Sequence, residues 1–200
     1  LIILMWGYGK WLRGMIRLID IFFSFVNLII LSPVFLFIFV LLWLDNRSPI
    51  FNQIRVGRFQ KPFVIFKFRT MRLDTNSIPT HLTEVSSITK YGHFLRRTKL
   101  DELPQLWNVL RGQMSLVGPR PCLFNQEELI HEREELGVFN ALPGITGLAQ
   151  IQKIDMSTPK LLAKTDAEML ASFSLLNYCR YIFLTALGKG TGDRIKIKKI

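Results

Sequence analysis

The chain has 200 residues, of which 49% are hydrophobic, with a formal net charge of +11 and a mean hydropathy of +0.25. This length suits one domain plus an anchor, and the apolar content excludes a largely disordered chain because it can build a core. The charge favours an anionic partner, namely nucleic acid, a membrane surface or a phosphate-rich substrate, and the apolar segment near the N-terminus favours the membrane.

The first predicted element is an apolar segment, residues 21–44, which as a helix is long enough to cross about 30 Å of hydrocarbon. Ser32 and Pro33 interrupt it, and proline breaks or kinks a helix because its nitrogen carries no hydrogen. Basic residues flank the segment on both sides, namely Lys10, Arg13 and Arg17 before it and Arg47, Arg55, Arg58 and Lys61 after it. The positive-inside rule places both flanks on the cytoplasmic side. We therefore expect a re-entrant helical hairpin, with a kinked spanning helix as the alternative.

The segment after the hairpin predicts a strand that ends in cations. Residues 63–66 are apolar and aromatic, which is typical of a buried strand. Lys67 and Arg69 follow directly. They are either solvated cations at a strand end or a cationic shelf for phosphates. Residues 73–90 are polar and rich in turn formers, and we expect a loop there.

An amphipathic helix is predicted next. Its apolar residues recur at i, i+3, i+4 and i+7 and are Leu103, Leu106, Trp107 and Leu110. Asp101 suits the N-cap, Pro104 is tolerated in the first turn, and Gly112 suits the end of the helix.

The acidic pair Asp101 and Glu102 stands at the start of this helix. Taken alone, such a pair is most often a helix cap followed by a glutamate that matches the helix dipole. Here Arg96 and Arg97 lie just upstream, and Arg120 lies on a loop with a proline on each side. A carboxylate can act as a nucleophile at phosphorus, and a neighbouring carboxylate can hold Mg²⁺. The residues therefore favour a site for a substrate that contains phosphate.

The remaining elements are predicted from capping and turn residues. Asn125 suits the cap of a charged helix ending near Gly137, and residues 143–147 suit a turn. A further helix is expected to start at Thr158 and Pro159. The apolar run of residues 169–187 contains Asn177 and Arg180, so a helix at the interface or in the core is favoured over a second membrane span.

The motif KLDELPQLWNVLRGQMSLVGPRP, residues 99–121, closely resembles the signature of the bacterial sugar transferases of the monotopic phosphoglycosyl transferase family. Residues 53–71 and 143–150 resemble the other blocks of that family, in the same order. The N-terminal apolar segment with its central Ser-Pro matches as well. The resemblance extends over most of the chain, from about residue 17 to residue 187.

The resemblance implies an enzyme that moves a sugar 1-phosphate from a UDP-sugar to polyprenyl (undecaprenyl) phosphate and releases UMP. Asp101 matches the nucleophile that forms a covalent phosphosugar intermediate, and Glu102 matches a ligand of Mg²⁺, with Mn²⁺ as an alternative metal. The residues expected to bind the substrate are Lys67, Arg69, Arg96, Arg97 and Arg120. Ser32 and Pro33 match the break of the re-entrant helix. Asp166 matches an aspartate to which we assign no role.

The implied fold is a small, mainly helical α/β domain on the cytoplasmic face of the bacterial inner membrane, with interfacial amphipathic helices. Residues 1–48 would form the N-terminal segment and re-entrant anchor, and residues 49–200 the catalytic domain. The implied partners are the UDP-sugar, polyprenyl phosphate and the phospholipid membrane, and no nucleic acid, since no nucleic-acid motif is present. The pathway would be capsule, O-antigen or exopolysaccharide assembly.

Departures from the family pattern after Gln150 leave the sugar open, and an N-acetylated deoxyhexosamine is our expectation. A non-catalytic membrane scaffold of a glycan-assembly complex is the alternative function. The presence of both Asp101 and Glu102 favours the enzyme.

Overall fold

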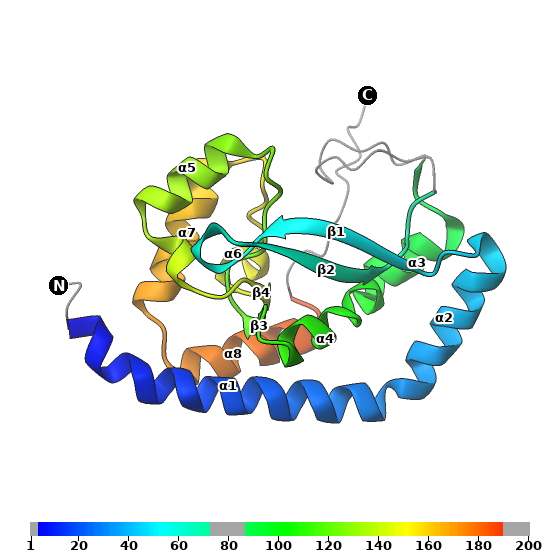
Figure 1. Ribbon diagram of the computed structural model, residues 1–200, viewed down its shortest axis with the longest axis horizontal. Helices are drawn as coiled ribbons and strands as arrows, with labels where there is room; N and C mark the ends of the chain where they lie inside the picture. Colours follow the sequence, from blue (N-terminus) through cyan, green and yellow to red (C-terminus); the bar gives the residue numbers. More distant parts are fainter. Residues whose placement is uncertain (1–3, 73–86, 190–200) are drawn as a thin grey trace.

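A computed structural model describes residues 4–72 and 87–189 (Figure 1). These residues are mainly helical and include two small two-stranded sheets, as the mainly helical α/β class predicts. The predicted loop of residues 73–90 falls mostly outside the described residues, as does the basic end of the chain.

A bent pair of helices forms the N-terminal part of the structure, α1 (Leu4–Ile30) and α2 (Ser32–Asn46). In Figure 1, α1 runs along the bottom of the molecule and α2 rises at its end. The helix axes of Trp11–Ile30 and Ser32–Asp45 are bent by 63°. Among the described residues no single helix is long and apolar enough to cross a membrane, whereas the two helices of this bent pair together are.

The break falls at Leu31, directly before the predicted Ser32 and Pro33. Pro33 lies in the first turn of α2, where its missing N–H costs no intrahelical hydrogen bond. The Ser32 hydroxyl donates to the Ile29 carbonyl at 2.7 Å, which satisfies one of the carbonyls that the break leaves open. The predicted break is thus confirmed, but the helix before it begins well upstream of the apolar segment.

The strands β1 (Ile50–Val56) and β2 (Pro62–Phe68) pair antiparallel and are joined by the 3₁₀ helix η1 (Arg58–Gln60). The predicted strand at residues 63–66 is confirmed and extends at both ends. Its first half is buried on one face, with Phe63 and Ile65 buried and Val64 exposed, whereas at its end Lys67 and Phe68 are both buried.

The second sheet pairs β3 (Ser115–Val117) with β4 (Gly144–Thr146) in parallel. The predicted turn at residues 143–147 is therefore wrong. Glycine at position 144 allows the backbones of the two strands to approach closely, because a Cβ there would lie 2.0 Å from the Gly118 nitrogen. Two backbone hydrogen bonds extend the pairing, from the Gly118 amide to Thr146 and from the Gly144 amide to Pro119.

Helices and short 3₁₀ turns make up the rest. They are α3 (Lys90–Thr98), η4 (Leu100–Glu102), α4 (Gln105–Leu110), α5 (Glu127–Glu135), η5 (Val138–Asn140), α6 (Leu148–Ile151), α7 (Pro159–Ala171) and α8 (Leu175–Ala186). The left-handed glycines Gly112 and Gly137 follow α4 and α5, and Pro159 opens α7, all as predicted.

Two helix predictions are corrected by the structure. Gln126, and not Asn125, precedes α5, and the Gln126 side chain accepts a hydrogen bond from the Leu123 amide instead of capping the helix. The apolar run of residues 169–187 is divided between α7 and α8. The two helices are separate because the Ser174 hydroxyl accepts a hydrogen bond from the Asn177 amide and so caps the start of α8.

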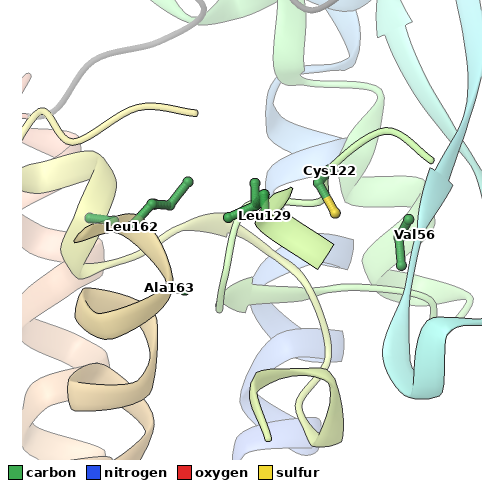
Figure 2. Close-up of a cluster of buried hydrophobic side chains, with 6 residues drawn as sticks. Val56, Cys122, Leu129, Leu162 and Ala163 are labelled. Atoms are coloured by element: carbon green, nitrogen blue, oxygen red, sulfur yellow. The ribbon is translucent and has the colours of Figure 1, made fainter. Parts of the chain in front are cut away.

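One hydrophobic cluster joins α5 and α7 to the tip of β1 (Figure 2). Its buried members include Val56, Cys122, Leu129, Leu162 and Ala163. Burial raises the pKa of the Cys122 thiol, so this cysteine acts as a small apolar side chain in the core.

The helix α1 is fixed to the rest of the chain by two polar side chains on one face. Asp20 is 1% exposed and accepts hydrogen bonds from the Leu116 amide, the Ser115 hydroxyl and the Tyr178 hydroxyl. Burial and the neighbouring Asp20 raise the pKa of Tyr178, which keeps its phenol protonated as a donor. Arg17 donates to the carbonyls of the last turn of α4, Val109 at 2.5 Å and Leu110 at 2.7 Å.

We predict that Asp20→Ala lowers the free energy of unfolding by on the order of 3 kcal/mol, because it leaves buried donors of β3 and α8 without their acceptor. For a chain of this size the melting temperature should fall by about 10 °C, measured on the detergent-purified protein. Asp45→Ala, which removes an exposed carboxylate from α2, is the matched control and should change little. Equal melting temperatures for the two variants would contradict the assignment.

Candidate active site

The acidic pair lies in a tight turn between two helices. Lys99 adopts a left-handed backbone, with φ of 60°, and ends α3. The chain then enters η4, which contains Asp101 and Glu102, before α4 begins at Gln105. Asp101 is therefore not the N-cap of α4, and that prediction is wrong. The left-handed Lys99 explains the difference, because it turns the chain into a 3₁₀ helix before an α-helix can form.

Both carboxylates are buried, with Asp101 4% exposed and Glu102 6% exposed. Two cations meet the same oxygen of Glu102. The Lys67 Nζ lies 3.3 Å from Glu102 Oε1, and the Arg120 Nη2 lies 2.6 Å from it. A buried carboxylate is costly without such partners, so the cations stabilise its charged form. The structure thus brings together predicted residues from β2, η4 and the loop after β3.

A buried asparagine fixes β2 against α4. Asn108 is fully buried, and its amide donates to the Val64 carbonyl at 2.7 Å and accepts from the Phe66 amide at 3.1 Å. It thereby takes the place of a neighbouring strand at the second edge of β2. Lys67, the next residue along β2, is held at a fixed distance from η4 as a result. Asn108 was not predicted from the sequence, where its signal was a polar residue between the apolar Trp107 and Val109.

The other predicted cations lie elsewhere. Arg69 donates to the carbonyls of Ser48 and Ile50, at the junction of α2 and β1. Arg96 donates to the Thr70 hydroxyl at 2.8 Å, and Arg97 lies exposed on α3. These contacts place Arg69 and Arg96 near the end of β2, and the binding of substrate by the three arginines stays a prediction.

The loop that carries Arg120 is tied to its surroundings along its backbone. The Arg120 carbonyl accepts from Arg133 at 2.9 Å, the Pro121 carbonyl from Arg55 at 3.2 Å, and the Cys122 carbonyl from the Val56 amide at 3.0 Å. Pro119 and Pro121 fix their own φ angles as well. The guanidinium of Arg120 therefore extends from a backbone with little freedom.

The donor atoms of the acidic pair fit a magnesium ion by their chemistry. Mg²⁺ prefers oxygen ligands and usually takes one or two carboxylates together with substrate phosphates and water. Within residues 4–72 and 87–189 no group of three or more His, Cys, Asp or Glu side chains is placed to hold a metal. Glu102 would thus supply part of the coordination, and a phosphate substrate the remainder.

An apolar cavity of about 270 Å³ lies between the bent helices and the segment after the acidic pair. It is lined by Leu28, Phe35, Ile50, Phe66, Pro104 and Trp107. Pro104 follows Glu102 by two positions, so the cavity adjoins the polar site along the chain. Its lining suits an apolar ligand and offers no charged partner.

Comparison with known proteins places the chain in a family. The family model described as "Bacterial sugar transferase" matches residues 11–189. The chain is 37% identical over 191 residues to the "Exopolysaccharide production protein PSS" of Rhizobium leguminosarum bv. phaseoli, covering 88% of this chain and 94% of that protein.

Two longer relatives are similar over the same region. The chain is 36% identical over 192 residues to the "UDP-glucose:undecaprenyl-phosphate glucose-1-phosphate transferase" of Escherichia coli (strain K12), covering 89% of this chain and 41% of the relative. It is 35% identical over 189 residues to an "Uncharacterized sugar transferase" of Haemophilus influenzae, covering 84% of this chain and 39% of that protein. The chain thus spans about two fifths of the length of these two relatives.

Proposed function

Because the chain belongs to the bacterial sugar transferase family, we propose that it moves a sugar 1-phosphate from a UDP-sugar to a polyprenyl phosphate and releases UMP. The resemblance of residues 99–121 to that family is confirmed by the match over residues 11–189. The names of relatives that act on UDP-glucose and undecaprenyl phosphate support the substrates. The observation that carries the proposal is the buried Glu102 carboxylate between Lys67 and Arg120, directly after Asp101.

We propose a double displacement with Asp101 as the nucleophile. A carboxylate oxygen of Asp101 attacks the phosphorus that bears the sugar, and the bond from that phosphorus to the UMP oxygen breaks. The product is a sugar phosphate joined to Asp101 as a mixed anhydride. An oxygen of the polyprenyl phosphate then attacks the same phosphorus and releases the Asp101 carboxylate.

The alternative is direct attack by the lipid phosphate, with Asp101 as a general base. A phosphate acceptor is already anionic near neutral pH and needs no base to activate it. Two successive steps also let UMP depart before the second anionic substrate arrives. Both considerations favour the covalent route.

Lys67 and Arg120 would bind the diphosphate. A guanidinium has several N–H donors in one plane, so Arg120 can contact Glu102 and a phosphate oxygen at the same time. Glu102 would hold Mg²⁺, or Mn²⁺ in its place. The metal would supply positive charge that neutralises the diphosphate and the leaving group.

We propose further that α1 and α2 enter and leave the cytoplasmic face of a bacterial inner membrane as a re-entrant hairpin. The 63° bend and the basic flanks support this arrangement. Large apolar side chains are exposed along both helices, among them Phe22, Phe25, Ile30, Leu36 and Phe37. Contiguous apolar surface of this kind is rare on soluble proteins and is stabilised by contact with lipid.

The sugar and the pathway are open to a direct experiment. Relatives carry names that refer to glucose and galactose transfer, and an N-acetylated deoxyhexosamine stays our expectation. UMP release from a panel of UDP-sugars would identify the donor. Release from none of them would favour the non-catalytic scaffold.

Incubation of the enzyme with its UDP-sugar and no lipid acceptor should give one UMP per active site and a sugar-phosphate adduct on the peptide that contains Asp101. Mass spectrometry checks the adduct, and steady-state kinetics should give parallel double-reciprocal lines. Asp101→Asn should lose the adduct and nearly all turnover because the nucleophile is gone. Asp45→Asn, at an exposed site, is the control and should retain both.

Intersecting double-reciprocal lines without a burst of UMP would favour the single displacement and contradict the covalent intermediate on Asp101. Excess EDTA should abolish the adduct, and Glu102→Gln should weaken both the rate and the metal dependence. Adduct formation that persists in EDTA would remove the metal from the proposal and leave the covalent step standing.

We predict that cysteines placed ahead of residue 1 and at Arg47 are both protected from an impermeant maleimide in intact cells. Both cysteines are introduced into the Cys179→Ser variant, because Cys179 is exposed and would itself be labelled, whereas Cys122 is buried. Labelling of one of the two positions would refute the hairpin. Pro33→Leu restores a backbone donor, and we expect it to straighten the pair and expose the N-terminal cysteine.

We also propose that the apolar cavity accepts part of the polyprenyl chain. Leu28→Trp, which fills the cavity from α1, should raise KM for undecaprenyl phosphate about tenfold while KM for the UDP-sugar stays constant. Ile29→Trp is the matched control, because Ile29 is 57% exposed and does not line the cavity. Equal effects of the two variants, or equal effects on both substrates, would argue against this site.

A further inference from the structure

The most deeply buried ion pair among the described residues joins two helices that carry no predicted catalytic residue. Arg133 of α5 is 1% exposed and Asp166 of α7 is 0% exposed. The Arg133 Nη2 and Nε donate to the same oxygen of Asp166, at 2.6 Å and 3.0 Å. Burial raises the pKa of Asp166, and the Arg133 charge opposes that shift.

The ion pair is not expected to stabilise the fold more than apolar side chains in its place would. Replacement of a buried ion pair by well-packed apolar side chains is often neutral or stabilising, because burying two charges costs so much solvation. The surroundings already offer such packing through Leu129 and Leu162. The second oxygen of Asp166, Oδ1, is buried without a hydrogen-bond partner in the part of the chain that the structure describes. A carboxylate retained in these surroundings points to a requirement other than packing.

The third contact of Arg133 leads to the acidic pair. Its Nη1 donates to the Arg120 carbonyl at 2.9 Å, and the Arg120 guanidinium lies 2.6 Å from Glu102. A continuous series of polar contacts therefore runs from Asp166 on α7 through Arg133 and Arg120 to Glu102 on η4. Asp166 fixes the plane of the Arg133 guanidinium, and that plane fixes the direction of the donor that reaches Arg120.

We propose that Asp166 and Arg133 are positioning residues of the transfer reaction, which hold the Arg120 backbone so that its guanidinium meets Glu102 and the substrate phosphate. This inference rests on the proposed function. Neither residue touches the substrate. Other hydrogen bonds at Pro121 and Cys122 keep the loop folded when the pair is broken, so the expected defect is a misplaced Arg120 and not a lost loop.

A double-mutant cycle tests the proposal. Asp166→Asn removes the charge that orients Arg133 and should lower kcat with undecaprenyl phosphate and the UDP-sugar that releases UMP in the panel by about 100-fold, the cost of a small misplacement of a binding group. Arg120→Lys loses the fork geometry and should cost at least as much. Because Asp166 acts through Arg120, the double variant should be no slower than Arg120→Lys alone.

UMP binding by calorimetry provides a readout that needs no turnover. Asp166→Asn and Arg120→Lys should weaken UMP binding, again without additivity. Leu162→Ala is the control, since it removes packing from the same helix and cluster while leaving the ion pair intact. It should lower the melting temperature and leave UMP affinity and the kinetic constants within about twofold, because the contacts of Arg133 with Asp166 and with Arg120 stay in place.

If Asp166→Asn fails to fold, Arg133→Lys replaces it in the cycle, because lysine keeps the charge beside Asp166 but cannot also reach Arg120 as a planar fork does. Additive losses in the double variant, or losses matched by Leu162→Ala at equal destabilisation, would overturn the positioning role alone. Absence of both UMP binding and UMP release in the wild type would overturn the proposed function and this inference with it.

Discussion

A buried carboxylate on the bent helix pair, Asp20, sets where the rest of the chain lies. An unpaired carboxylate in an apolar interior is costly, so the helix is stable only where donors from β3 and α8 converge on Asp20. Arg17 lies on the same face and binds the end of α4, the helix that follows the acidic pair. The rotation of α1 and the position of α4 are therefore not independent. If α1 lies in the membrane as proposed, the depth of the acidic pair follows from these contacts.

Buried carboxylates paired with donors or cations from other elements occur at several places in the fold. The chain carries a net charge of +11, yet the structure buries the acidic residues Asp20, Asp101, Glu102 and Asp166. Asp20 meets two hydroxyls and an amide, Glu102 meets Lys67 and Arg120, and Asp166 meets Arg133. In each case the carboxylate joins elements that are distant in sequence, by between 18 and 158 positions. Apolar clusters bring these elements together, and the directional contacts of the carboxylates determine how they are oriented.

Features with a local cause could be predicted from the sequence. The break before Pro33, the ends of α4 and α5 at Gly112 and Gly137, and the start of α7 at Pro159 each depend on the backbone chemistry of one residue. The remaining features depend on distant contacts. Residues 144–146 form a strand because Gly118 lies against Gly144, and Asn108 acts as a strand neighbour because β2 has an open edge. The acidic pair and Arg120 could be predicted because they lie in a recognisable motif. Asp20, Asn108 and Arg133 could not, because their partners lie far along the chain.

The burial of the acidic pair also bears on the choice between an enzyme and a scaffold. A surface that only recruits other proteins gains nothing from carboxylates that are 4% and 6% exposed beside two cations, since desolvation of such groups is costly and apolar side chains pack as well. An enzyme that binds a diphosphate gains from the same arrangement, because cations held in place before the substrate arrives need no reorganisation in the transition state. The arrangement costs stability in the empty protein and stabilises charge during transfer. Such an exchange of stability for charge stabilisation is characteristic of catalysis.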